Sequence, residues 1–363
     1  MSFPEASLLL RAVRSPEDLR ELTNPQWDLL LRWLWKCRLI GRVALSCDAA
    51  GISGSLPQKV QQQFESALVL IDKQRQMVAW EADRVGWALQ GLEVPVVLLK
   101  GAAYMLSGFD FQHGRLFADL DVMVPVDDLA RVEERLRQRG WRFIKLNAYD
   151  ERYYRIWSHE LPPMRHFERE VELDVHHTIL PLTSRLTPDR EKLWERTQAL
   201  SGTPFRILAP EDMVLHSAVH LFHDGELADA IRDVLDLDGL MRIFSQQPEF
   251  WDTLMLRAGE LGLARPLFYA LHYCDRFLET PVPDHVIASA RKNAPPLPLR
   301  LAMDAMVPRA LFPQNPDKSD ARTGIARWML YTRAHWLRMP PSILLPHLAR
   351  KGLRRVTGRP KDH

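Results

Sequence analysis

The segment Phe117-Ala-Asp-Leu-Asp-Val-Met-Val124 constrains the fold more than any other part of this 363-residue chain. Its apolar and acidic residues alternate, and a period of two is typical of a β-strand with one buried face. Leu120 and Val122 would point into a core, whereas Asp119 and Asp121 would share the opposite face. We therefore expect a half-buried strand that carries two carboxylates about 6.6 Å apart.

An apolar run precedes this segment and turns directly into a helix. Val96–Leu99 is typical of a buried strand, and Lys100 and Gly101 end it before a helix that begins at Ala102. Glycine lets a phosphate approach the backbone, and the start of a helix offers oriented N–H groups. Lys100, together with Arg115 ahead of the acidic pair, has the charge to neutralise a triphosphate.

A third acidic residue lies on a later predicted strand, Val171–His176. Alternation places Asp174 on one face with His176, and pairing with the first strand would put Asp174 about 4.8 Å across the sheet. Carboxylates so close repel one another unless a cation lies between them, and Mg²⁺ prefers oxygen ligands. We therefore expect a Mg²⁺ site, with Mn²⁺ as the alternative ion, at Asp119, Asp121 and Asp174.

Helical patterns flank this central part on both sides. Residues 59–90 contain no proline and predict one long helix, and helical signals resume at Pro210. We expect an α+β fold with a helical region over 1–75, a mixed-sheet core over 76–205 and a second helical region over 206–363.

Composition and charge narrow the class of protein. Hydrophobic residues make up 46% and charged residues 26%, as in ordinary globular proteins. The formal net charge of +2 argues against a surface devoted to nucleic acid. Cys37, Cys47 and Cys274 have no metal-site or redox-pair spacing, and no apolar run approaches the length of about 20 residues that spans a bilayer. We expect a cytoplasmic protein without a signal peptide or transmembrane segment.

Together these motifs resemble the nucleotidyltransferase superfamily of the DNA polymerase β type, and in particular a bacterial family of uncharacterised nucleotidyltransferases. The resemblance covers about residues 75–240 and rests on Leu99-Lys-Gly-Ala-Ala103, Arg115, Asp119-Leu-Asp-Val-Met-Val-Pro125 and Leu173-Asp-Val-His176. A helical stretch also looks similar in its polar residues Asp212, His216, His220 and Asp236.

The resemblance implies a nucleotidyltransferase-like mixed sheet with flanking helices. It further implies transfer of a nucleotidyl group from a nucleoside triphosphate such as ATP to an acceptor hydroxyl, with release of pyrophosphate. Asp119 and Asp121 would hold the metal, and Asp174 would complete the metal site and activate the acceptor. The acceptor stays open between a small molecule, a sugar, a protein and RNA. The nucleotide contacts would come from Lys100, Gly101, Ala102 and Arg115.

Histidines support a second hypothesis. His216, His220 and His223 recur at a spacing that places them on one helix face, and His223 forms an HD pair with Asp224. Imidazoles arranged in this way bind transition metals, as in metal-dependent phosphohydrolases of the HD type. Otherwise this helix covers the sheet, and His220, like His176, has a supporting role beside the nucleotide.

A third hypothesis is a catalytically silent member that binds a nucleotide or a partner protein. It rests on Gly101-Ala102, because the more usual superfamily pattern has Gly-Ser or Gly-Gly at this turn. Ala102 offers no hydroxyl to a phosphate, so only backbone N–H groups could serve there.

The last fourteen residues form a basic tail. Such a run can contact RNA or an anionic membrane surface, although a solvated terminus is the simpler interpretation. Its basic residues are Arg350, Lys351, Arg354, Arg355, Arg359 and Lys361.

Overall fold

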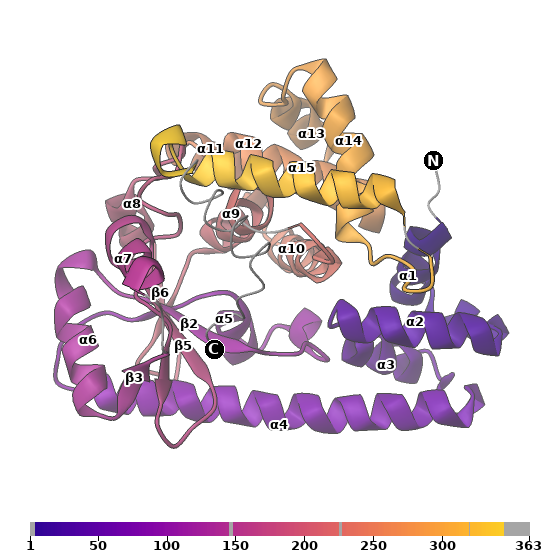
Figure 1. The fold of residues 1–363 in the computed structure, drawn as a ribbon, viewed down its shortest axis with the longest axis horizontal. Coiled ribbons are helices and arrows are strands. Elements are labelled where there is room, and N and C mark those ends of the chain that lie inside the picture. Colours follow the sequence, from indigo (N-terminus) through magenta and orange to yellow (C-terminus); the bar gives the residue numbers. More distant parts are fainter. Residues whose placement is uncertain (1–3, 145–147, 225–226, 319, 345–363) are drawn as a thin grey trace.

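Helices form the N-terminal part of the chain, as predicted. In the computed structural model they are α1 (Pro4–Arg14), α2 (Asn24–Lys36), α3 (Ile40–Ala49) and the 32-residue α4 (Gln58–Leu89). α4 begins directly after Pro57, and Gly91, with a φ of 80°, follows its end. The predicted long helix is thus confirmed, and it runs along one side of the whole molecule (Figure 1).

A seven-stranded mixed sheet follows, in the order β3-β4-β5-β2-β1-β7-β6. β2 is central: it pairs parallel with β5 and antiparallel with β1. The predicted strands are present, and the β6–β7 hairpin is an addition that the sequence analysis did not predict. The strands are β1 (Val97–Leu98), β2 (Asp119–Met123), β3 (Trp141–Phe143), β4 (Met164–His166), β5 (Glu172–His176), β6 (Gln198–Ala199) and β7 (Arg206–Ile207).

Four helices connect or follow these strands, and a helical group completes the described chain. The four are α5 (Lys100–Leu106), α6 (Leu129–Gln138), α7 (Ala148–Trp157) and α8 (Arg190–Glu195). The helical group begins at Pro210, as predicted, and a π-helical turn, His220–Asp224, extends its first helix. It consists of α9 (Pro210–Val219), α10 (Ile231–Phe244), α11 (Phe250–Glu260), α12 (Ala264–Leu278), α13 (Asp284–Arg291), α14 (Leu297–Leu311) and α15 (Ala321–Arg338).

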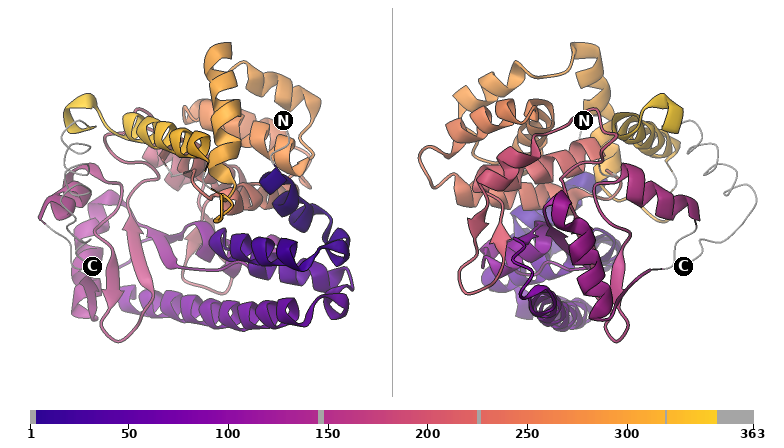
Figure 2. Two further views of the ribbon diagram at one scale, coloured as in Figure 1. Left: turned by 45° about the vertical axis from the view of Figure 1, so that its right-hand side comes forward. Right: turned by 90° about the vertical axis from the view of Figure 1, so that its left-hand side faces the viewer.

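The sheet lies between two layers of helices. α4 packs against β2, α5 and α6 on one side, and α9 packs against α10, α11 and α12. Figures 1 and 2 show α11–α15 on the side of the molecule opposite α4, with the sheet and α5 between them. In this arrangement Asp121 of β2 is buried, whereas Asp119 at the start of the strand is exposed.

The structure describes residues 4–144, 148–224, 227–318 and 320–344. The basic tail, including the predicted contact residues from Arg350 to Lys361, lies outside them. Within these ranges no helix has the length and apolar character needed to cross a membrane.

Candidate active site

Strand register brings the acidic residues of β2 and β5 onto one face of the sheet. Asp121 lies opposite Asp174, and Asp119 lies opposite Glu172. Alternate residues share a face, so His176 lies on the same side as Asp174. The structure therefore brings together the three aspartates that the sequence singled out. The residues between them are at most 1% exposed and belong to the core: Leu120, Val122, Leu173 and Val175.

Asp121 is held from two directions. Its Oδ1 accepts a hydrogen bond from Lys100 Nζ at 3.0 Å and lies 2.9 Å from Nε2 of His176. Burial raises the pKa of Asp121, but Lys100 and the hydrogen bond to His176 outweigh that effect and hold the pKa well below its ordinary value. Asp121 is therefore a fixed carboxylate at neutral pH.

Lys100 is the first residue of α5, and from there it reaches Asp121. Its φ is 47°, a left-handed backbone conformation that is uncommon for a residue with a side chain. Burial lowers the pKa of Lys100, but the carboxylates of Asp121 and Glu160 raise that pKa above its ordinary value. Lys100 is therefore an ammonium that neutralises part of the acidic cluster.

Asp174 and Asp119 are less constrained than Asp121. Asp174 Oδ1 is buried, yet it has no hydrogen-bond partner among the described residues. Burial, followed by the charges of Glu160 and Asp121, raises the pKa of Asp174 well above its ordinary value. Asp119 is exposed at the start of β2. The acidic cluster thus consists of four carboxylates and one ammonium: Asp119, Asp121, Glu160, Asp174 and Lys100. Such a cluster, with a buried oxygen that lacks a hydrogen-bond partner, has the composition of a divalent cation site.

Sequence reasoning did not identify His159 and Glu160. Glu160 forms an isolated β-bridge with His176, and its Oε2 lies 3.4 Å from Nδ1 of that histidine. One ligand atom from each of His159, Glu160 and His176 lies within 4.8 Å of the others. Because the loop after α7 brings them to β5, no local spacing in the sequence signals this group.

Gly101 and Arg115, for which phosphate contacts stay a prediction, lie together in a junction with Asp236. The Arg115 Nε lies 3.0 Å from Oδ2 of Asp236, and Arg42 binds the other oxygen of that carboxylate at 3.1 Å. A Cβ added at Gly101 would lie 2.3 Å from a guanidinium nitrogen of Arg115. The space beside Gly101 therefore holds Arg115. The next residue, Ala102, is buried.

The predicted histidine face divides between two environments. Lys100 and then burial lower the pKa of His220 to about 3, and burial and Lys100 lower that of His216 well below its ordinary value. Both are therefore neutral imidazoles close to the acidic cluster. His223 instead lies with its Nε2 2.9 Å from Oγ of Ser184. The side chain of Asp224 lies outside the described residues, and the described histidines of this helix do not converge on one metal position.

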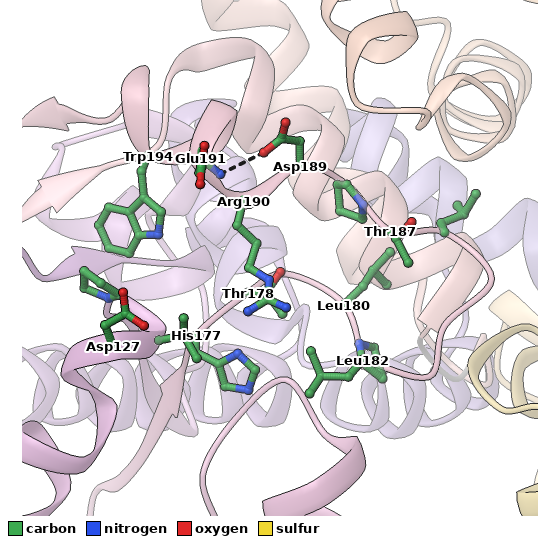
Figure 3. A pocket seen from close by; sticks show the side chains of 15 residues that line it. Asp127, His177, Thr178, Leu180, Leu182, Thr187, Asp189, Arg190, Glu191 and Trp194 are labelled. Carbon is green, nitrogen blue, oxygen red and sulfur yellow. Dashed lines mark hydrogen bonds between the residues drawn. The ribbon is translucent and has the colours of Figure 1, made fainter.

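A separate pocket of about 550 Å³ lies beyond the carboxyl ends of β2 and β5 (Figure 3). Asp127 and His177 line it from the strand side, and Arg190 and Trp194 line it from α8. Burial and Arg190 lower the pKa of His177 to about 4. The acidic cluster does not contribute to the lining of this pocket.

Comparison with protein families identifies the class. The sequence profile of a family described as uncharacterised nucleotidyltransferases matches residues 23–279, well over half of the chain, so the chain belongs to that family. No curated protein matches it.

Two solved structures from Helicobacter pylori are similar in part. JHP933 is 15% identical, with 76% of this chain and 98% of that chain covered and a TM-score of 0.31. A second protein, described as a proposed nucleotidyltransferase, is also 15% identical, with 72% and 97% covered and a TM-score of 0.30. Because overall superposition at these scores is poor, the family assignment rests on the sequence profile.

Proposed function

We propose that this protein transfers a nucleotidyl group from a nucleoside triphosphate to an acceptor hydroxyl and releases pyrophosphate. The observation that carries the proposal is the orphaned, buried Oδ1 of Asp174 beside Asp121 on the neighbouring strand. The family assignment supports the same class of reaction. The free, buried cysteines agree with the cytoplasmic location that we also propose.

Asp119, Asp121 and Asp174 would hold Mg²⁺, or Mn²⁺ in its place. The fit rests on their oxygen donors and on the charge of the cluster, which Lys100 neutralises only in part. When bound, the ion polarises phosphoryl oxygens and neutralises charge that develops on them. Both Mg²⁺ and Mn²⁺ prefer carboxylate ligands, so either ion fits this set of oxygen donors.

The residues of the chain would act mainly by positioning. In the reaction the acceptor oxygen forms a bond to the α-phosphorus, the bond from that phosphorus to the pyrophosphate oxygen breaks, and the acceptor proton passes to Asp174. Lys100 and His176 fix the orientation of the Asp121 carboxylate on β2 through their contacts to its Oδ1. Neutral His216 and His220 lie near this charged cluster without adding positive charge.

Replacement of Asp119 by asparagine tests this proposal. Asp119 is exposed, so Asp119→Asn is expected to keep the fold and to abolish nucleotidyl transfer. We would screen the four common nucleoside triphosphates by thermal shift with and without Mg²⁺, since a ligand at about 100 times its Kd stabilises the folded state by about 2.7 kcal/mol. Asp72→Asn on the exposed surface of α4 is the matched control.

Transfer itself would be followed with triphosphates labelled at the α-phosphate and with pyrophosphate detection, using small-molecule, RNA and protein fractions as acceptors. The wild type and the Asp72→Asn control should label one fraction, and Asp119→Asn should label none. Normal labelling by Asp119→Asn would refute the assignment. Triphosphate binding by the wild type without pyrophosphate release would instead indicate a silent nucleotide-binding member.

A further inference from the structure

A triphosphate at the acidic cluster needs cations beyond those the sequence suggested. The two predicted groups already have partners, because Lys100 binds Asp121 and Arg115 binds Asp236. The exposed end of β2 at Asp119 is the side from which a nucleotide could enter. Basic side chains near Asp119 that keep free hydrogen-bond donors are therefore the groups suited to bind the phosphates of that nucleotide.

Two ion pairs bring the turn between α2 and α3 against the start of α10. Lys36, the last residue of α2, lies 3.2 Å from Asp229, which precedes α10. Arg42, in the first turn of α3, binds Asp236 at 3.1 Å. Arg38 lies in the turn between these two links, so its position against α10 is set from both sides.

Arg232 is the cation that α10 contributes to this junction. It lies in the first turn of that helix, one turn before Asp236, and its side chain is 19% exposed. The ion pairs of Asp229 and Asp236 lie on either side of Arg232 and bind residues on either side of Arg38. The charge of Arg232 lowers the pKa of both Arg38 and Asp119. Arg232 lies 3.0 Å from Asp233, its neighbour in sequence, and this contact leaves most of its guanidinium donors for a further ligand.

Arg38 has an unusual environment for an arginine. Its φ is 57°, and its side chain is exposed with no hydrogen bond or ion pair to another described residue. Burial of part of the side chain and the charge of Arg232 lower the pKa of Arg38, whereas Asp119 raises it. A left-handed conformation is strained for a residue with a side chain. A strained turn that presents an arginine beside a second arginine is therefore suited to an anion.

We propose that Arg38 and Arg232 bind the β- and γ-phosphates of the nucleoside triphosphate whose α-phosphate lies at Asp119. Guanidinium groups bind phosphate oxygens through paired hydrogen bonds, and two of them offset most of the negative charge of the β- and γ-phosphates. The inference rests on the proposed function and extends it. It assigns the N-terminal helical region a direct role in substrate binding, through one residue of the α2–α3 turn.

Binding of nucleotides that differ in phosphate number tests this inference. We would measure Kd by calorimetry for a nucleoside triphosphate, the monophosphate and inorganic tripolyphosphate, with Mg²⁺ present. Arg38→Gly and Arg232→Gln are each expected to bind the triphosphate and tripolyphosphate about tenfold more weakly, equivalent to about 1.4 kcal/mol. Monophosphate binding should not change, because it lacks the β- and γ-phosphates. The exposed Arg20→Gln is the matched control and should match the wild type.

Arg38→Gly also separates binding from folding. Glycine adopts a φ of 57° without strain, so this variant should be at least as stable as the wild type while it loses affinity. Wild-type affinity for the triphosphate in both variants would overturn the inference and leave the proposed function intact. Failure of the wild type to bind any triphosphate would overturn the proposed function and, with it, this inference.

Discussion

At the residue scale, the three aspartates of the site differ in what holds them. Asp121 is fixed between Lys100 and His176, and its pKa is correspondingly low. Asp174 has a buried oxygen with no described hydrogen-bond partner, and Asp119 is exposed. Asp119 can therefore be replaced with little structural cost, whereas a change at Asp121 would also leave the half-buried Lys100 ammonium without its partner.

His223 gives a pH prediction at the same scale. Burial, with Arg333, lowers the pKa of its imidazole to about 4, whereas an unfolded chain has a histidine pKa of about 6.5. Between these values the unfolded state binds a proton that the folded state does not, so the contribution of His223 to stability is complete above pH of about 6.5 and is lost as the pH falls toward 4.

His223→Gln, which keeps a partner for Ser184, is expected to remove this part of the pH dependence. The free energy of unfolding of the wild type should then fall more steeply than that of the variant, by at most about 1.4 kcal/mol per pH unit. Urea unfolding of both proteins at a series of pH values would measure this difference in pH dependence. Parallel curves for the two proteins would show that the His223 imidazole does not titrate as described.

At the element scale, Asp236 joins three parts of the fold. Its carboxylate binds Arg42 of α3 and Arg115 of the segment before β2, and Asp236 itself belongs to α10. Gly101 completes the junction, because a larger residue at the start of α5 would displace the Arg115 guanidinium. This junction sets the position of the acidic strand relative to the N-terminal helices.

Asp236→Asn is therefore expected to lower the free energy of unfolding by about 3–5 kcal/mol, since it leaves two largely buried guanidinium groups without a counter-charge. Asp252→Asn is a suitable control, because the Asp252 side chain is 78% exposed and its loss should change stability by no more than about 0.5 kcal/mol. Urea denaturation of both variants would measure the difference. Equal stability of the two would show that the Asp236 pairs make no net contribution.

At the scale of the whole molecule, α4 connects the N-terminal helices to the sheet. Near its start Phe64 packs edge-on against Trp27 of α2, and near its end Glu81 accepts a hydrogen bond from Trp141 of β3. The predicted boundary between residues 75 and 76 falls inside this helix (Figure 1). The division into three regions stays a prediction.

We expect one cooperative unfolding transition for the N-terminal helices and the sheet, because a helix about 48 Å long belongs to both. Circular dichroism and tryptophan fluorescence should report coincident urea midpoints. Glu81→Ala, which removes the contacts to Trp141 and Arg169, is expected to separate them. Two transitions in the wild type would contradict the shared-helix argument and favour independent regions.

The local sequence pattern by itself determined several helices and strands of this protein. Alternation in β2, the uninterrupted helix before Gly91 and the helix start at Pro210 depend on near neighbours, so they can be recognised in a single sequence. For the same reason the two predicted acidic strands are found at the expected residues.

Tertiary structure alone decided the partners of these elements. Arg115 meets Asp236 across 121 residues, and Glu160 reaches His176 through a loop whose length carries no periodic signal. The same packing filled the space at Gly101 with a guanidinium and placed the turn between α2 and α3 beside α10. Such contacts depend on how whole elements pack, and no spacing along the chain encodes them.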